Sequence, residues 1–167
     1  MLVTGLFADE KKQYIGIAHA LTIAKTYTIQ NTGISELSLK YGYMFNKYLG
    51  IELRRTLQLL KRDEMNHTYS YGLYLKPNYA LYKDTNMYGF LGYSKNKLIK
   101  NETNFKNKET IQYDFSYGIG IEQMYAKNKY VYIDFLHYID KSTTRPEGQY
   151  TIKINSISMG LKYTFDF

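Results

Sequence analysis

Hydrophobic and polar residues alternate with a period of two along most of this chain. The segment from about 13 to 24 places on one side Ile15, Ile17, Leu21 and Ile23, and on the other Gly16, Ala18, Ala20 and Thr22. Successive side chains of a β-strand point to opposite faces, so this alternation predicts a strand with one apolar face. The pattern recurs seven times, at about 35–44, 49–59, 68–79, 87–98 and 111–125, around 131–135, and at the C-terminus around 157–167.

The segments between these predicted strands alternate in length. Long polar stretches fall at about 25–34, 60–67, 96–110 and 141–149, whereas tight turns fall at 45–48, 83–86 and 126–129. A strand of roughly 9–11 residues is long enough to cross a bilayer at a tilt. Together these features predict an all-β fold, an eight-stranded antiparallel up-and-down transmembrane β-barrel with long extracellular loops and short periplasmic turns. The alternation leaves open which side of segment 87–98 faces outward.

Lipid requires the larger apolar set of each strand to face outward, so the other set lines the interior. That inner set contains seven charged residues, predicted to lie at similar depth: Lys40, Glu52, Arg54, Lys76, Glu122, Asp134 and Lys162. Eight strands enclose a space that side chains fill, and an unpaired buried charge is costly. We therefore expect these residues to form a structural salt-bridge network that plugs the lumen, in place of a catalytic carboxylate pair or an ion path.

Composition supports a membrane barrel despite a mean hydropathy of −0.45. The 167 residues include 20 Tyr and 8 Phe but no Cys, which excludes disulfides and thiolate metal sites. Aromatic rings favour the headgroup level of a bilayer. The pattern puts Tyr41, Tyr43, Phe45, Tyr48, Tyr125, Tyr130, Tyr163 and Phe165 near the short-turn end, and Tyr27, Tyr69, Tyr71, Tyr113 and Tyr138 near the other.

The N-terminus and the charge add two expectations. Leu6, Phe7 and Ala8 precede a charged stretch and resemble the end of a secretory signal, so residues 1–8 are interpreted as a signal remnant and residues 9–167 as one barrel domain. An ordinary apolar N-terminal segment is the alternative. The net charge of +7 comes from lysines scattered through predicted loops, as at Lys95 and Lys97, which indicates solvated loops and no nucleic-acid partner.

Two residues fit the alternation poorly, and a third suggests an enzymatic role. Arg55 and His19 fall on the predicted lipid face, and we expect a β-bulge at 54–55 or snorkelling to relieve Arg55, in preference to a specific lipid site. His137 suggests a lipid A deacylase, in which a Ser two residues further on would be activated by the imidazole. Here that position is Ile139, so we expect no enzyme. Three scattered His residues predict no metal site, and no motif predicts a cofactor.

Several segments resemble the small outer-membrane β-barrel proteins of the OmpA/OmpX type. They are residues 41–52, 88–93, 117–122 and the ending 158–167. Tyr163, Phe165 and the terminal Phe167 resemble the C-terminal signal that the barrel-assembly machinery recognises in members of that family. The resemblance implies a bacterial outer-membrane location, contact with lipid and lipopolysaccharide, and a structural, adhesive or defensive role through the loops, with a host or surface ligand as a possible partner. It indicates a monomer, without fixing the oligomeric state.

Two alternative functions make different predictions about the interior of the barrel. A soluble lipocalin-like barrel for a small apolar ligand predicts an apolar lumen and a polar exterior. A narrow pore requires gaps in the charged interior.

Overall fold

The computed structural model describes residues 11–25, 32–60, 65–100, 108–145 and 148–166. Residues 1–8, Tyr27 and Phe167, on which earlier expectations fall, lie outside these ranges. The described chain forms eight strands and nothing else regular. They are β1 (Lys12–Lys25), β2 (Thr32–Met44), β3 (Leu49–Gln58), β4 (Met65–Tyr82), β5 (Thr85–Lys100), β6 (Lys108–Ala126), β7 (Lys129–Arg145) and β8 (Gly148–Asp166).

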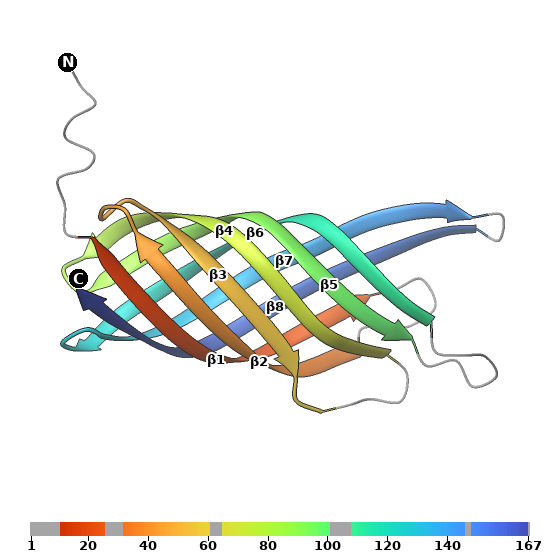
Figure 1. Cartoon of the computed structure of the whole chain (residues 1–167), viewed down its shortest axis with the longest axis horizontal. Helices are drawn as coiled ribbons and strands as arrows, with labels where there is room; N and C mark the ends of the chain where they lie inside the picture. Colours follow the sequence, from red (N-terminus) through yellow and green to blue (C-terminus); the bar gives the residue numbers. More distant parts are fainter. Residues whose placement is uncertain (1–10, 26–31, 61–64, 101–107, 146–147, 167) are drawn as a thin grey trace, which may run out of the picture.

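Each strand pairs antiparallel with its neighbours in sequence, and β8 closes the barrel by pairing with β1. The closing ladder runs from Lys12↔Asp166 to Lys25↔Lys153 without a register shift. Closure leaves no open edge along the wall, which is the condition for crossing lipid with strands. Figure 1 shows the tilted strands, with the start of β1 and the end of β8 at the same end of the barrel. The predicted fold class is confirmed.

Short turns lie at that same end, and two of them have clear local causes. In the turn between β2 and β3, the Asn46 side-chain oxygen accepts hydrogen bonds from the backbone N–H groups of Tyr48 and Leu49, at 2.8 and 2.9 Å. In the two-residue turn between β6 and β7, Asn128 has φ 63°, a conformation that Asn tolerates well. This end is periplasmic in the outer-membrane arrangement, and the opposite end is extracellular.

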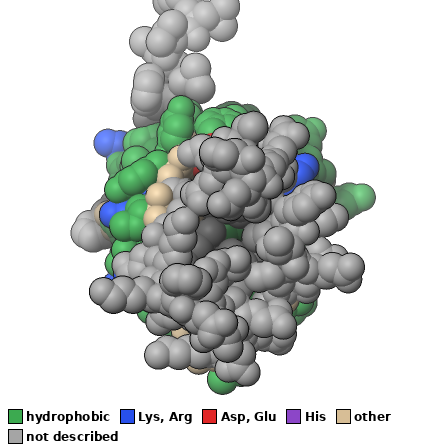
Figure 2. All heavy atoms as spheres, turned by 90° about the vertical axis from the view of Figure 1, so that its right-hand side faces the viewer, with side chains coloured by type: hydrophobic (Ala, Val, Ile, Leu, Met, Phe, Trp, Pro, Cys, Tyr) green, Lys and Arg blue, Asp and Glu red, His purple; other side chains and the backbone are tan. Residues whose placement is uncertain are grey.

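Apolar side chains cover the outer wall, as Figure 2 shows for the described residues around the barrel. Leu53 and Ile119, for example, are 55% and 54% exposed, while their sequence neighbours Glu52 and Gly120 are buried. The interior is polar and charged. This distribution is the reverse of what a soluble ligand-binding barrel requires, because there the apolar face lines the lumen.

The strands extend beyond several predicted boundaries. β7 continues to Arg145 and β8 begins at Gly148, so the stretch predicted as a long loop at 141–149 is mostly a paired hairpin. Lys95 and Lys97 lie in β5, where the sequence was interpreted as loop. Cross-strand hydrogen bonds can continue outside the bilayer as they do inside it. The polar composition of these segments is typical of loops, so the sequence did not predict that the strands continue.

Side-chain facing settles one open orientation and corrects two expectations. In β5, Tyr88 and Phe90 point into the lumen, which settles the orientation that the sequence left open. Tyr138, expected among the interface aromatics, is only 2% exposed and lies inside. Tyr130 is half-buried and lines the periplasmic mouth of the lumen. Both residues share the even-numbered face of β7 with the buried Tyr132 and Asp134.

The bulge expected at Arg54 and Arg55 is absent. β3 pairs with β2 and with β4 through this stretch without a register shift. Arg55 therefore lies on the outer wall as the alternation predicted, with its guanidinium carbon 5.2 Å from the centroid of the Tyr71 ring.

Candidate functional site

The structure places all seven charged residues named from the sequence in the barrel interior. Each is buried, with an exposed fraction of 6% or less; they are Lys40, Glu52, Arg54, Lys76, Glu122, Asp134 and Lys162. Six strands supply them, and each side chain reaches inward because its position has the inward parity of its strand. They form two groups, a central cluster and a periplasmic cluster.

The central cluster consists of Arg54, Glu52, Asp134 and Lys40. Arg54 of β3 donates to both oxygens of Asp134 of β7, with Nη1–Oδ1 and Nη2–Oδ2 distances of 3.0 and 2.9 Å. It also donates from Nε and Nη2 to Glu52 Oε1, at 3.0 and 2.7 Å. Lys40 Nζ lies 3.6 Å from Asp134 Oδ2. Bidentate guanidinium–carboxylate pairs are the strongest hydrogen-bonded ion pairs in proteins, so this group is rigidly held.

Hydroxyl groups complete the coordination of the central carboxylates. The Tyr14 hydroxyl donates to Glu52 Oε2 at 2.7 Å, and the Tyr88 hydroxyl donates to Asp134 Oδ2 at 3.4 Å. Ser158 of β8 donates to Asp134 Oδ1 as well. A carboxylate can be buried when its lone pairs meet donors, and both carboxylates satisfy that condition here.

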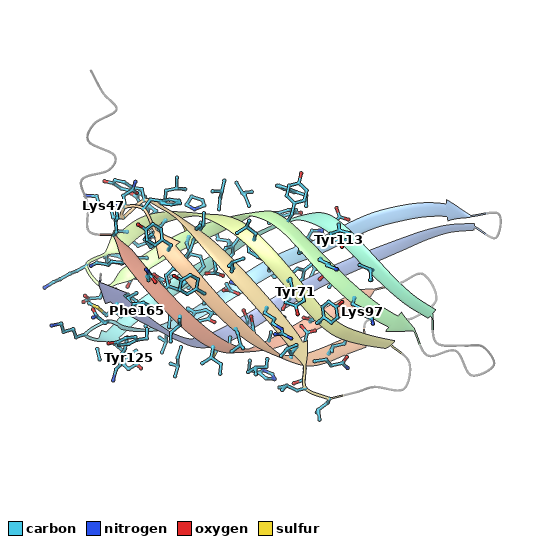
Figure 3. The ribbon with its side chains drawn as sticks, viewed as in Figure 1. Lys47, Tyr71, Lys97, Tyr113, Tyr125 and Phe165 are labelled. Atoms are coloured by element: carbon cyan, nitrogen blue, oxygen red, sulfur yellow. The ribbon has the colours of Figure 1, made fainter. Side chains whose placement is uncertain are left out.

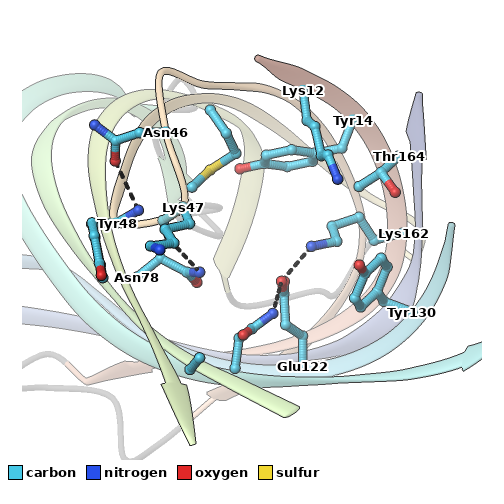
Figure 4. Close-up of a pocket in the computed structure, with 13 residues that line it drawn as sticks. Lys12, Tyr14, Asn46, Lys47, Tyr48, Asn78, Glu122, Tyr130, Lys162 and Thr164 are labelled. Atoms are coloured by element: carbon cyan, nitrogen blue, oxygen red, sulfur yellow. Dashed lines mark hydrogen bonds and ion pairs between the residues drawn. The ribbon is translucent and has the colours of Figure 1, made fainter. Parts of the chain in front are cut away.

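The periplasmic cluster is built around Glu122 of β6. Lys76 Nζ lies 3.3 Å from Glu122 Oε2, and Lys162 of β8 donates to Oε1 of the same carboxylate. Asn86 donates weakly to Oε1 at 3.5 Å. Figure 4 shows Lys162 and Glu122 joined at the periplasmic end, with Tyr14 and Tyr130 on the surrounding wall.

Aromatic rings stabilise the lysines that carboxylates only partly neutralise. Lys40 Nζ lies 3.1 Å from the centroid of the Tyr132 ring, and Lys76 Nζ lies 3.9 Å from that of Tyr88. Lys162 Nζ is 4.1 Å from the centroid of Tyr130. A desolvated cation over a ring gains about 2 kcal/mol. The lumen is therefore an interleaved set of cations, carboxylates and tyrosines.

Sequence reasoning missed part of this interior. Glu36 is completely buried and accepts a hydrogen bond from Thr22, and it raises the buried carboxylates to the same number as the cations named above. Glu36 lies two residues before Ser38 and four before Lys40, so the alternation alone would have predicted that it faces the interior. Apolar residues in the extracellular half of the lumen had no such signal. They pack as a cluster with the inner tyrosines: Ile34, Leu136, Ile154, Tyr138, Tyr74, Tyr88 and Phe90.

A pocket of about 470 Å³ opens at the periplasmic mouth and ends against Tyr14, Glu122 and Lys162. Each of the seven charged residues named from the sequence has an ion-pair partner or lies over an aromatic ring. Within the described ranges, His, Asp and Glu form no group of three that could hold a metal ion.

Two histidines, His137 and His19, are engaged in local contacts. His137 Nδ1 is hydrogen-bonded to Asn155 Oδ1 at 2.6 Å, and its ring lies 5.0 Å from that of Tyr117. His19 Nε2 lies 2.8 Å from Ser35 Oγ on the outer wall, a pair that the sequence did not predict. Among the described residues no carboxylate orients the His19 ring, so the third member of a hydrolytic triad is lacking there.

Two of the three C-terminal aromatics named from the sequence can be placed. Tyr163 is exposed on the outer wall at the short-turn end, and Phe165 beside it is half-buried. Their rings stack with centroids 6.3 Å apart. Figure 3 shows Phe165 at the same end as Lys47 and Tyr125.

An apolar wall around a closed, charged interior defines the class: an integral membrane β-barrel of eight strands. No described helix is long and apolar enough to cross a membrane. The chain belongs to the outer membrane protein beta-barrel domain family, whose model matches residues 7–165. The protein is therefore an integral protein of the bacterial outer membrane, and its wall contacts lipid.

Solved structures of small outer-membrane barrels share this fold. Neisserial surface protein A is 15% identical with a TM-score of 0.73, and the match covers 92% of this chain and 97% of that one. Ail, the attachment invasion locus protein of Yersinia pestis, is 17% identical with a TM-score of 0.66 over 93% and 99%; it was crystallised with the heparin analogue sucrose octasulfate. OprG from Pseudomonas aeruginosa is 13% identical with a TM-score of 0.66 over 97% and 100%. No curated protein matches the sequence.

Proposed function

We propose that this protein is a non-enzymatic surface-interaction protein whose extracellular end binds a partner outside the cell, in adhesion or defence. The observation that carries this proposal is a pair of projecting hairpins. The ladder between β6 and β7 ends, among the described residues, at Tyr117↔His137. β6 nevertheless begins at Lys108 and β7 continues to Arg145.

These continuations have backbone edges that no described strand covers. Residues 108–116 pair with β5 on one side only, and residues 139–145 pair with β8 on one side only. Figure 1 shows the β7–β8 hairpin reaching well beyond the rest of the barrel. An open edge presents unpaired N–H and C=O groups, to which an extended segment of another protein can add as a further strand.

The sealed interior also supports a role outside the barrel. Because the two charged clusters fill the lumen, the wall serves as a rigid support and solute passage is not its purpose. Ail, which shares the fold, was crystallised with a heparin analogue, and the extracellular ends of β5 and β6 include Lys100 and Lys108. A sulfated glycan is therefore a reasonable first ligand to test.

The test is adhesion of cells that display the protein to surfaces coated with extracellular-matrix protein or with heparin. The key variant shortens the β7–β8 hairpin by removing residues 142–151 and joining Lys141 to its register partner Ile152 with a two-residue turn. We expect adhesion to fall to the level of cells without the protein, while the unboiled protein still migrates as a folded barrel. Equal adhesion by cells with the intact protein, cells with the variant and cells with neither would contradict the proposal.

A further inference from the structure

Two cations lie on the outer wall of the barrel, where lipid is the expected neighbour. Arg55 of β3, Tyr71 of β4, Lys95 of β5 and Tyr113 of β6 are directly opposite one another in the sheet register. The guanidinium carbon of Arg55 is 5.2 Å from the centroid of Tyr71, and Lys95 Nζ is 5.3 Å from that of Tyr113. Cation and ring therefore alternate across four neighbouring strands.

A groove of about 600 Å³ runs along this row. Apolar side chains make up much of its wall: Leu39, Leu53, Leu73, Tyr93 and Tyr113. The described residues that line it include no carboxylate, and none of the described residues forms an ion pair with Arg55 or Lys95. A cation on a lipid-facing wall is costly unless an anion meets it. The groove thus combines an apolar surface for a chain with two positive charges for an anion.

The height of the groove identifies the membrane leaflet. Figure 3 places Tyr71 and Tyr113 toward the extracellular end, whereas Lys47, Tyr125 and Phe165 mark the periplasmic end. Lipids of the outer leaflet are therefore the molecules that reach this groove. An amphiphile there needs phosphate groups at the level of the two cations and an acyl chain below them.

We propose that the groove binds a phosphorylated glycolipid of the outer leaflet, the lipid A class. A phosphate group is held between Arg55 and Lys95, and an acyl chain follows Leu39, Leu53 and Leu73 toward the membrane centre. Arg55 contributes forked donors that suit phosphate oxygens, while Lys95 contributes a point charge. The aromatic rings hold both side chains along the wall.

The experiment measures binding of purified lipid A to the barrel refolded in a zwitterionic detergent, by native mass spectrometry. Bisphosphorylated lipid A is compared with chemically dephosphorylated lipid A, and phosphatidylglycerol serves as the anionic competitor. We expect wild type to prefer the bisphosphorylated lipid by roughly tenfold or more, since each of the two cations near a membrane surface contributes about a fivefold factor. The double variant Arg55→Gln, Lys95→Gln should lose that preference.

A matched control lies on the same wall near the periplasmic end. There Lys129 borders a second groove, of about 520 Å³, together with Ile15, Ile17 and Tyr125. Lys129→Gln removes one exterior cation but faces the other leaflet, so it should leave the preference unchanged. Three results would overturn the site: no preference in wild type, a preference that persists in the double variant, or competition by phosphatidylglycerol as effective as by lipid A.

Discussion

Arg54 and Asp134 join opposite walls of the barrel through two parallel hydrogen bonds of 3.0 and 2.9 Å. β3 and β7 are four strands apart in a ring of eight, so this pair crosses the full width of the lumen. The planar guanidinium and the planar carboxylate fix the distance between those walls, and Glu52 accepts hydrogen bonds from the other edge of the guanidinium.

Breaking this pair from one side should strongly destabilise the barrel. Arg54→Met leaves the Asp134 and Glu52 carboxylates buried with fewer donors, a change that costs about 3–5 kcal/mol in comparable sites. Urea unfolding in lipid vesicles, read from the mobility of unboiled protein on gels, measures the loss. The double variant Arg54→Met, Asp134→Asn should recover part of it, because one buried carboxylate is then neutral. A double variant that loses the sum of both single losses would show that the two residues do not interact.

The filled lumen should conduct poorly. In planar lipid bilayers we expect wild type to show no steady current steps of porin size, because paired side chains occupy the interior. Arg54→Ala shortens the side chain that spans the lumen and should increase the frequency of brief openings. Large steady currents from wild type would instead support the narrow-pore alternative.

The ring of Tyr14 occupies space that a side chain at position 42 would need. A Cβ on Gly42 would overlap that ring, so Gly42→Ala should destabilise the barrel by about 1–3 kcal/mol. Gly33, on the same strand, is the control, since its Cβ would lie 3.7 Å from the nearest atom, Leu21 Cδ1. Gly33→Ala should be neutral or slightly stabilising in the same urea experiment. Equal effects of the two substitutions would argue against close packing at Tyr14.

The C-terminal aromatics should matter for assembly in cells more than for stability. Phe165→Ala together with deletion of Phe167 should lower the fraction of folded protein in outer membranes several-fold, if the barrel-assembly machinery reads them. Refolding of the same variant from urea into detergent should proceed normally. A similar loss in both settings would assign these rings a packing role.

The His19 and Ser35 pair should be inert. Lipid A from cells that express wild type or His19→Ala should have identical acyl chains by mass spectrometry, because no described carboxylate orients the ring. Removal of one acyl chain by wild type alone would overturn the non-enzymatic assignment.

Much of the fold can be predicted from the sequence, because the lipid outside and the crowded lumen inside restrict which residue types each position accepts. Strict alternation placed Glu52 and Arg54 inside and Leu53 and Arg55 outside, and the structure has them so. The expected bulge was wrong, because β3 continues in register through Arg55, whose guanidinium lies beside the Tyr71 ring on the outer wall.

Other features could not be predicted, because the alternation determines which face of the strand a residue occupies but not its position along the barrel axis or its contact partner. Tyr138 is of the residue type expected at a membrane interface, yet it packs in the barrel interior as part of the apolar cluster. The pairing of Arg54 with Asp134 depends on which walls stand opposite across the ring, and that follows only from closure. Strand length beyond the bilayer, as in β7, depends on cross-strand pairing that polar composition conceals.

The lumen contacts also constrain how the barrel can be made. Glu52 needs Tyr14 from the first strand, Asp134 needs Arg54 from the third, and Glu122 needs Lys162 from the last. A partly built sheet in lipid would expose these groups without their partners. Insertion and closure are therefore expected to occur as a single cooperative event, with half-inserted intermediates too costly to accumulate.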